Sequence, residues 1–492
     1  MTLFSVAALR QRGRQLGTRL RRHSADRPSF RTLLLIGCGL GYLLTLVYIH
    51  RSLPAMHVDE GFQIALSSRS LSEITVSLTQ DMHPPLYSYL LHFWMRLFGV
   101  GMTSARSFSI VTSLLGSVVF YRWLRHRLGI IPSLLGTGIY VSFTMHLVYA
   151  VVARNYALLL LAVVATLAYV YRTWSLPLTR GRLIGLVSLQ TALLYTHNLA
   201  IPLLAAGYAF FYVSKPTRER LRHYSLGLAL TGVAFLPWAL VILNQLGIRA
   251  GEAGWLSFEP LADLHEIAGA VVPKLEGGRR YIAWILAGGL YVYSTRVWRR
   301  QVSPYARTTA VILGLSILCM YLLSFRQPLF YDRYLMVTLP LLAYLLAHAL
   351  PREKLSQIGV GLLIILANLA IFQEVQQDFR NGDFYDIEQG LYSRDEASVT
   401  VIDLPTYYYH LEVLGYENIR VFDPERNSPA WSGVALMRPA DYLSSADLEG
   451  VRQVQYLSQY NRPFEDYFAR AGYRVAKQRS AGSVEVYLLE KN

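Results

Sequence analysis

Long apolar runs separated by basic clusters are the feature that most restricts the fold of this chain. The first run covers residues 32–49, and further runs follow at short intervals to about residue 372. A run of about 18 apolar residues is long enough to cross a bilayer as a helix. With 53% hydrophobic residues in 492, the chain is also too apolar for an ordinary soluble protein. The sequence therefore predicts an all-α polytopic membrane protein over residues 32–373.

The distribution of positive charge predicts the orientation of these spans. The net charge is +15, but the arginines and lysines gather at the ends of apolar runs, where the positive-inside rule accounts for them without a nucleic-acid partner. Residues 1–31 are rich in arginine, and no small-residue cleavage pattern follows the first apolar run. Both features favour a retained signal anchor with a cytoplasmic N-terminus. Cys38 and Cys319 each lie inside an apolar run, so no disulfide framework is indicated.

The apolar stretch 86–98 decides how the remaining spans alternate. As a helix it would be roughly 20 Å long, which is too short to cross, and it carries Arg96. If it crossed, the next run would end outside with Arg122, Arg125 and Arg127 on the wrong face. We therefore expect a juxtamembrane helix at the outer interface. The total is then about eleven transmembrane helices, with the C-terminus outside.

The later spans follow from the same alternation of apolar runs and basic clusters. After residues 107–121 we expect spans near 131–149, 156–171, 224–243, 308–325 and 357–372, with two short runs around residues 195–198, an eighth span before Arg296, and a tenth that ends near Arg352.

The chain changes character at about residue 373. Residues 399–402, 419–422 and 454–457 are typical of short buried strands, 464–471 of a helix, and 475–478 with 484–489 of a hairpin. We expect a small extracytoplasmic α/β domain over 374–492, after a cytoplasmic segment 1–31 and a membrane domain 32–373 with an outer loop 51–106. Tyr407, Tyr408 and Tyr409 are more typical of a half-buried helix than of a sugar-binding surface.

The outer loop 51–106 holds the residues most typical of chemistry. Asp59 and Glu60 come just after the first span, where an ionised side chain near lipid is costly, although acidic residues in a solvated loop are also common. His83 is followed by Pro84 and Pro85, which restrict the backbone and so hold a polar side chain in one direction. Because the Asp59-Glu60 segment and the His83-Pro84-Pro85 segment share one short loop, we favour a functional site here over an ordinary solvated loop.

The other unusual polar residues fall on the same predicted side of the membrane. Carboxylates can act as bases or bind cations, histidines can bind metals or relay protons, and arginines can hold phosphate in a forked geometry. A lipid-phosphate substrate fits all three of these residue types. Simpler alternatives stay open: His197 can cap a turn, Arg154 and Arg333 can anchor the interface, and Lys274 can be an ordinary loop charge. The set comprises Asp59, Glu60, Asp81, His83, Arg154, His197, Lys274, Arg326 and Arg333.

Several segments together resemble a known family. They are Asp59-Glu60 after the first span, Asp81-x-His83-Pro84-Pro85-Leu86-Tyr87, Arg106-Ser107, Ala153-Arg154-x-Tyr156-Ala157-Leu158, Tyr195-Thr196-His197 and Asp332-Arg333-Tyr334-Leu335. Over about residues 32–350 the chain resembles the GT-C fold glycosyltransferases, in the bacterial branch related to protein O-mannosyltransferases and the lipid A aminoarabinose transferase (glycosyltransferase family 39-like). The resemblance implies transfer of a sugar from a polyprenyl-phosphate donor to a lipid, glycan or protein acceptor outside the plasma (inner) membrane.

The resemblance also implies roles for individual residues. Asp59 matches the catalytic carboxylate that deprotonates the acceptor, and Glu60 is its neighbour that orders the loop. Asp81 and His83 match a second loop motif, where members hold a divalent metal cation or the acceptor and the donor phosphate. His197 matches a histidine that can serve as a metal ligand.

The remaining positions match residues that contact the substrate. Arg154 and Tyr87 would contact it directly, and Arg333 with Arg326 would contact the carrier phosphate. Members often carry a carboxylate where this chain has Val151-Val152. The absence of that carboxylate argues against the metal site or against the usual acceptor. One direct displacement would invert the anomeric centre.

Two other classes remain as alternatives. A transporter or flippase of polyprenyl-linked lipids would need ionisable groups or broken helices near the midplane, whereas the span centres here are nearly free of charge. A non-catalytic assembly protein is the second alternative, which Val151-Val152 keeps open.

Overall fold

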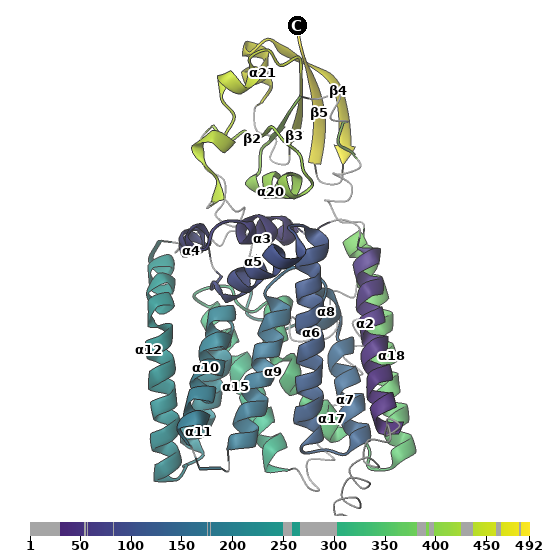
Figure 1. The fold of residues 1–492 in the computed structure, drawn as a ribbon, viewed down its shortest axis with the longest axis vertical. Coiled ribbons are helices and arrows are strands. Elements are labelled where there is room, and N and C mark those ends of the chain that lie inside the picture. Colours follow the sequence, from purple (N-terminus) through teal and green to yellow (C-terminus); the bar gives the residue numbers. More distant parts are fainter. Residues whose placement is uncertain are drawn as a thin grey trace, which may run out of the picture. The chain divides into compact units, whose positions relative to one another are not determined.

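The computed structural model describes most of the chain (Figure 1). Helix α2 (Phe30–Ser52) begins in one compact unit, Met1–Tyr48, and ends in a second, Ile49–Asn492. Lys274 and the eighth predicted span lie outside the described residues. The described residues are 30–53, 56, 58–81, 83–174, 176–177, 179–248, 258–265, 303–380, 390–392, 398–424, 436–458, 464–481 and 484–492.

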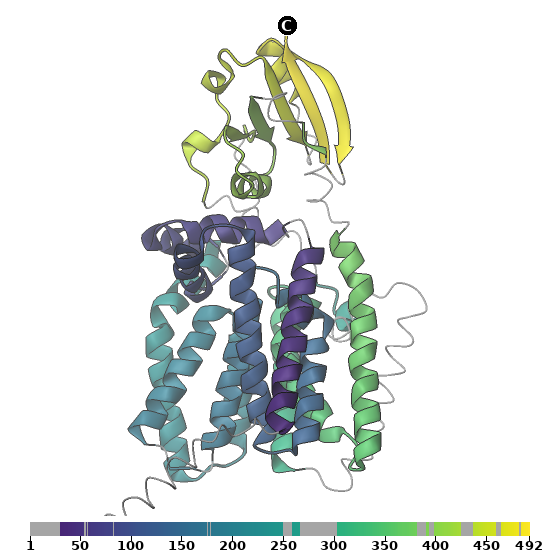
Figure 2. The same ribbon diagram turned by 45° about the vertical axis from the view of Figure 1, so that its right-hand side comes forward.

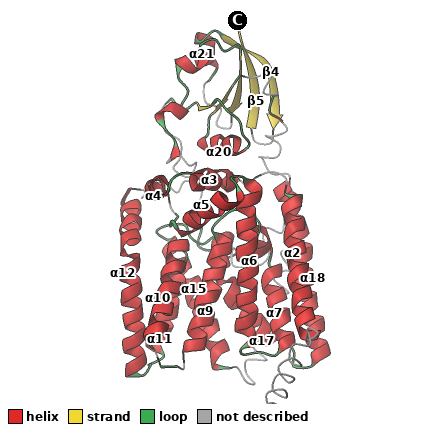
Figure 3. Ribbon diagram, viewed as in Figure 1, coloured by secondary structure: helices red, strands yellow, loops and turns green. Residues whose placement is uncertain are grey.

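Long apolar helices make up most of the described structure, red in Figure 3. Within the described ranges, five helices are long and apolar enough to cross a membrane: α2, α6 (Met102–Arg125), α9 (Tyr156–Thr173), α12 (Arg218–Ile248) and α15 (Pro304–Ser324). Shorter or less apolar helices accompany them: α7 (Ile130–Ser142), α10 (Arg180–Thr196), α11 (Ala200–Val213) and α18 (Lys354–Arg380). The chain is a multi-pass membrane protein, as predicted, while the number of spans and their orientation stay predictions.

Two runs that we expected to be continuous spans are interrupted. The run at 131–149 breaks at Phe143, whose non-helical backbone separates α7 from α8 (Thr144–Tyr149). The tenth span is divided into α16 (Asp332–Leu335), η2 (Met336–Thr338) and α17 (Leu339–Ala349). Pro340 stands in the first turn of α17, where its missing N–H breaks no helical hydrogen bond. Arg154 lies in the irregular segment that follows α8, and Arg333 lies in the one-turn helix α16.

Three short helices form the first predicted outer loop: α3 (Val58–Ser68), α4 (Leu71–Gln80) and α5 (Leu86–Phe98). They lie across the ends of α6, α10 and α12 (Figure 1). A capping box between Ser70 and Glu73 starts α4.

Helix α5 has the bounds that the sequence predicts and is amphipathic. It buries Tyr87, Leu91 and Met95 and exposes Phe93 and Leu97. A short helix with one exposed apolar face fits the membrane surface better than a span.

The C-terminal part contains a five-stranded sheet in the order β2-β1-β3-β5-β4. The strands β1 and β2 are parallel, as are β1 and β3, whereas β5 is antiparallel to both β3 and β4. The hairpin of β4 and β5 is yellow in Figure 2. The strand bounds are β1 (Val399–Ile402), β2 (Ile419–Val421), β3 (Gln453–Ser458), β4 (Tyr473–Ala481) and β5 (Val484–Lys491).

Helices cover both faces of this sheet. Helix α20 (Pro405–Val413) packs Tyr407 and Leu411 onto one face, and α21 (Glu465–Arg470) packs Phe468 onto the other. Covered faces explain why the residues of β1 are all buried and mostly apolar. The α/β arrangement that the sequence predicts for this region is therefore present, and Tyr407–Tyr409 lie on a helix.

Candidate active site

Asp59 stands in the first turn of α3, where the partial positive charge of a helix N-terminus favours a carboxylate. Its Oδ2 lies 3.7 Å from Arg154 Nε and 3.7 Å from Arg333 Nη1. The Asp59 side chain is 28% exposed, whereas those of Arg154 and Arg333 are 8% and 19% exposed. The carboxylate is thus the accessible member of a charged cluster drawn from three distant segments of the chain.

Glu60 connects the elements behind this cluster. Both of its carboxylate oxygens accept hydrogen bonds from Arg106, at 2.9 Å from Nε and 2.7 Å from Nη2. Its Oε1 also accepts from the amide of Ala153 at 2.7 Å, next to Arg154. Arg106 in turn donates to the carbonyl of Leu53. Glu60 is fully buried, so it orders the backbone around Arg154 and is closed to a substrate.

His83 continues the cluster away from Asp59. Arg154 Nη2 lies 3.4 Å from His83 Nε2, and Asp81 Oδ2 lies 3.0 Å from His83 Nδ1. A guanidinium group can only donate, so Nε2 accepts and the ring proton is on Nδ1, donated to Asp81. The amide of Gln245 in α12 donates to the carbonyls of Leu78, Thr79 and Asp81, which holds the segment before Pro84.

His197 lies between α10 and α11, with its ring 5.6 Å from that of His83 and 5.4 Å from that of Tyr156. Its Nδ1 accepts a hydrogen bond from the amide of Leu199 at 3.2 Å. Burial lowers the pKa of His197 well below its ordinary value, and nearby His83, Arg154 and Arg333 lower it further. The neutral ring therefore carries its proton on Nε2, which is buried and has no hydrogen-bond partner among the described residues.

Arg333 lies in the one-turn helix α16 among aromatic rings. Its guanidinium carbon lies 5.4 Å from the ring centres of both Tyr331 and Tyr334. Rings at this distance attract a cation, and they also keep the long side chain in place. The group can therefore present N–H donors to an anion beside Asp59.

The three predicted metal ligands do not fit a divalent cation in this arrangement. His83 Nε2 faces Arg154, and His197 Nδ1 already accepts from Leu199. The remaining nitrogen of each ring carries a proton, and a protonated nitrogen cannot bind a metal. Only Asp81 is left as a ligand, and no group of three or more His, Cys, Asp or Glu side chains in the described part of the chain could hold a metal ion.

The structure brings together six of the ten residues that the sequence nominates: Asp59, Asp81, His83, Arg154, His197 and Arg333. It does not bring Tyr87 into this cluster, because its ring is buried among apolar residues, with its hydroxyl 3.4 Å from Ser109 Oγ. Arg326 is exposed after α15, and no ion pair joins it to the described members of the cluster. Glu60 lies behind the cluster on Arg106.

Sequence reasoning missed the supporting roles of Arg106 and Gln245. Arg106 lies in the second turn of an apolar span, a position that requires a partner when it is buried. That requirement, together with an acidic residue in the preceding outer loop, is a signal that pairs Arg106 with Glu60. Gln245 at the end of α12 gives no such signal, because an uncharged amide at a helix end is ordinary.

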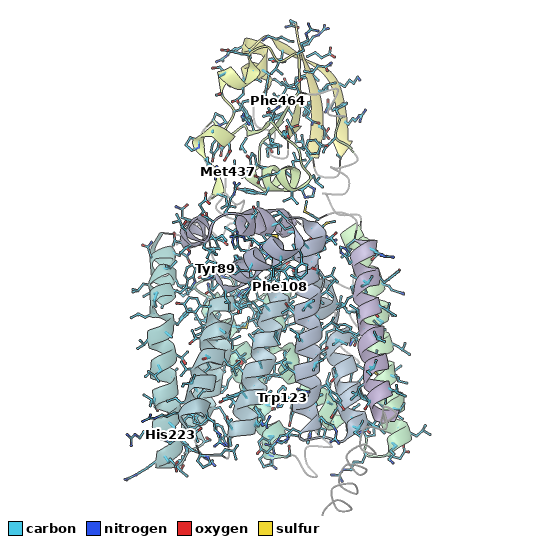
Figure 4. The ribbon with its side chains drawn as sticks, viewed as in Figure 1. Tyr89, Phe108, Trp123, His223, Met437 and Phe464 are labelled. Atoms are coloured by element: carbon cyan, nitrogen blue, oxygen red, sulfur yellow. The ribbon has the colours of Figure 1, made fainter. Side chains whose placement is uncertain are left out.

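The opposite end of the bundle holds a cavity of about 310 Å³ with a different character. Its lining includes Tyr171, Trp174, Phe211 and Tyr224, and no carboxylate or histidine is among the described residues that line it. Figure 4 places Trp123 and His223 at that end and Tyr89 and Phe108 at the end with α3 to α5. The cavity is apolar and separate from the charged cluster.

Comparison with known proteins supports the same fold. The model of the family described as dolichyl-phosphate-mannose-protein mannosyltransferase matches residues 82–241, which include His83, Arg154 and His197. No curated protein sequence matches the chain.

Two solved structures of ArnT from Cupriavidus metallidurans are similar to the chain over nearly their whole length. The apo structure has a TM-score of 0.59 at 14% identity and covers 92% of this chain and 98% of that one. The structure bound to undecaprenyl phosphate has a TM-score of 0.61 at 13% identity with the same coverage. At this identity the likeness concerns the backbone, and the chain therefore has the GT-C fold of these structures.

Proposed function

We propose that this chain is a membrane glycosyltransferase that moves a sugar from a polyprenyl-phosphate carrier to a hydroxyl group of an acceptor. The proposal places the reaction at the extracytoplasmic face of the plasma (inner) membrane, with Asp59 as the base and inversion at the anomeric carbon. It leaves the identity of the sugar to experiment, and the acceptor can be a lipid, a glycan or a protein.

The observation that carries the proposal is the position of the partly exposed Asp59 carboxylate between the guanidinium groups of Arg154 and Arg333. In the transfer, the bond between the anomeric carbon and the phosphate oxygen breaks, and negative charge grows on the phosphate. Arg333 can donate hydrogen bonds to that charge. A new bond forms to the acceptor oxygen, whose proton passes to Asp59.

Two buried side chains can assist this step. The neutral His197 has an Nε2–H without a partner among the described residues, so it can donate to an oxygen of the sugar or the phosphate. Arg154 is held between Asp59 and His83, which limits its movement. Preorganised donors of this kind stabilise developing charge without rearranging during the reaction.

The comparisons support the class of donor. The family model that matches residues 82–241 is named for dolichyl-phosphate-mannose, and one similar structure is that of ArnT bound to undecaprenyl phosphate. Both names contain a polyprenyl-type phosphate. A transferase that uses such a carrier needs hydrogen-bond donors for one phosphate group and a base close to them. The charged cluster provides both.

The test is transfer from undecaprenyl phosphate that carries labelled sugars, with the purified parent, Asp59→Asn and Asp466→Asn in vesicles that contain native membrane lipids. Asp466 is exposed on α21 and serves as the matched control. We expect the parent and Asp466→Asn to form a labelled glycoside, and Asp59→Asn to lose at least about 10²-fold in rate. A flippase would move the carrier lipid without forming a glycoside, and an inert scaffold would do neither; either result contradicts the proposal.

A further inference from the structure

The sheet domain meets the membrane domain at the helix that carries Asp59. Helix α20 packs against α3, and their backbones approach closely at Gly61. A Cβ atom on Gly61 would lie 3.0 Å from both the Cα and the N of His410, and 3.3 Å from the carbonyl carbon of Tyr409. A side chain at this position, two residues after the proposed base, would therefore require the backbone of α20 to shift by a few tenths of an ångström.

Further contacts join the same two helices along their length. The rings of Phe62 and Tyr409 meet edge to face with centroids 5.5 Å apart. At the far end of α3, Arg69 Nη2 lies 3.2 Å from Glu412 Oε1. Val413 of α20 packs against the apolar cluster that lies beneath α3. The contact therefore extends from the second turn of α3 to just beyond its last residue.

The other side of α3 is held by the membrane domain. Glu60 binds Arg106 of α6, and the Gln63 amide donates to Ser88 of α5 at 3.0 Å. Helix α3 thus lies between two bodies, while Arg154 and Arg333 belong to the membrane domain alone. A shift of α20 would act directly on α3, which carries Asp59, whereas Arg154 is joined to α3 through the hydrogen bond between Glu60 and the amide of Ala153.

We propose that the C-terminal domain is a positioning element for the reaction: α20, seated on Gly61, sets where the Asp59 carboxylate stands between Arg154 and Arg333. This inference rests on the proposed function of Asp59. Gly61 and His410 are positioning residues, because they act through α3 and touch no substrate. The domain then contributes to the rate of transfer rather than to donor binding.

The first experiment is the series Gly61→Ala and Gly61→Val, with Gly232→Val in α12 as control, since a Cβ at Gly232 meets nothing within 4 Å. Each added carbon pushes α20 and α3 apart, and a misplacement of about 1 Å can cost roughly 10²-fold in rate. We expect kcat to fall several-fold for Gly61→Ala and about 10²-fold for Gly61→Val, while the KM for the donor changes less than about threefold. A folded Gly61→Val enzyme with the parent kcat overturns the inference.

The second experiment exchanges the charges of Arg69 and Glu412. Arg69→Glu and Glu412→Arg each place like charges at the contact, whereas the double variant restores an opposite pair. We expect each single variant to lower kcat and the double variant to recover at least half of the loss. Equal kcat in all four proteins, or no recovery in the double variant, contradicts positioning through this contact.

The third experiment works without any transfer activity, so it separates this inference from the proposed function. Cys38 and Cys319 are replaced by serine, and Asp59→Cys is alkylated with iodoacetamide over a range of pH. Neighbouring guanidinium groups favour a thiolate, so we expect a midpoint below the ordinary value of about 8.5. Adding Gly61→Val should raise that midpoint by half a unit or more. An unchanged midpoint overturns the positioning role even where the parent transfers no sugar, a result that by itself contradicts only the proposed function.

Discussion

Glu60 and Arg106 form a two-pronged ion pair in which the side chains are 0% and 1% exposed. Breaking a buried pair by removing one charge leaves the other uncompensated, at a cost of about 3 to 5 kcal/mol. We therefore expect Glu60→Gln to lower the free energy of unfolding by about that amount, measured by denaturation in detergent. Glu449→Gln, on the exposed surface of the sheet domain, is the control and should change it by less than about 0.5 kcal/mol.

Replacing both partners of this pair gives a sharper result than either single change. In Glu60→Leu with Arg106→Met no charge is left buried, so we expect the double variant to be more stable than Glu60→Gln. A Glu60→Gln protein as stable as the parent would mean that the ion pair does not contribute to the stability of the fold, and Glu60 would then need another role.

The sequence contains enough to predict the elements around the site. The length of α5, its Arg96 and the basic residues at the end of α6 are sufficient to predict a surface helix with the bounds observed. The shared loop and the proline pair likewise group Asp59 with His83, and Arg154 links them in the structure. These features are local in sequence, so periodicity and charge reveal them.

Contacts between distant segments could not be predicted in the same way. Tyr87 lies on the amphipathic helix α5, but only the packing of that helix shows that the ring faces the core. The approach of His410 to Gly61 joins residues of two domains and leaves no periodic pattern. The breaks at Phe143 and between α16 and α17 were missed because both runs are mostly apolar, so composition alone favours a continuous helix.

Arg333 and Arg326 differ in ways that binding measurements can separate. Arg333 lies beside Asp59, whereas Arg326 is exposed and outside the cluster. A hydrogen bond to a charged group contributes about 1.5 to 3 kcal/mol, so Arg333→Ala should weaken equilibrium binding of undecaprenyl phosphate about 10- to 100-fold. Arg326→Ala, the matched control, should weaken it less than about threefold. Equal losses would place the carrier phosphate elsewhere.

Chelation tests the divalent cation that the resemblance implies. The imidazole nitrogens of His83 and His197 are occupied by Arg154, Asp81, Leu199 and a ring proton, so the cluster offers a cation few ligands. We expect treatment with EDTA, checked by elemental analysis, to leave the rate of sugar transfer within about twofold. Loss of activity that added Mg²⁺ or Mn²⁺ restores would show that the histidines turn to bind a metal.

The buried His197 predicts a pH dependence of stability. Burial lowers its pKa, aided by the positive charges of Arg154 and Arg333 and by His83, while in the unfolded chain it titrates near 6.5. The unfolded state therefore binds more protons below about pH 6.5, so the folded state loses stability as the pH falls through this value.

In His197→Asn, the amide oxygen can replace Nδ1 as acceptor for Leu199 without titrating. The free energy of unfolding, measured between pH 7.5 and 5, should fall less steeply for His197→Asn than for the parent. His223→Asn, at the opposite end of the bundle (Figure 4), should keep the steeper dependence of the parent. Parallel curves for the parent and His197→Asn would mean that His197 takes up a proton in the folded protein as readily as in the unfolded chain.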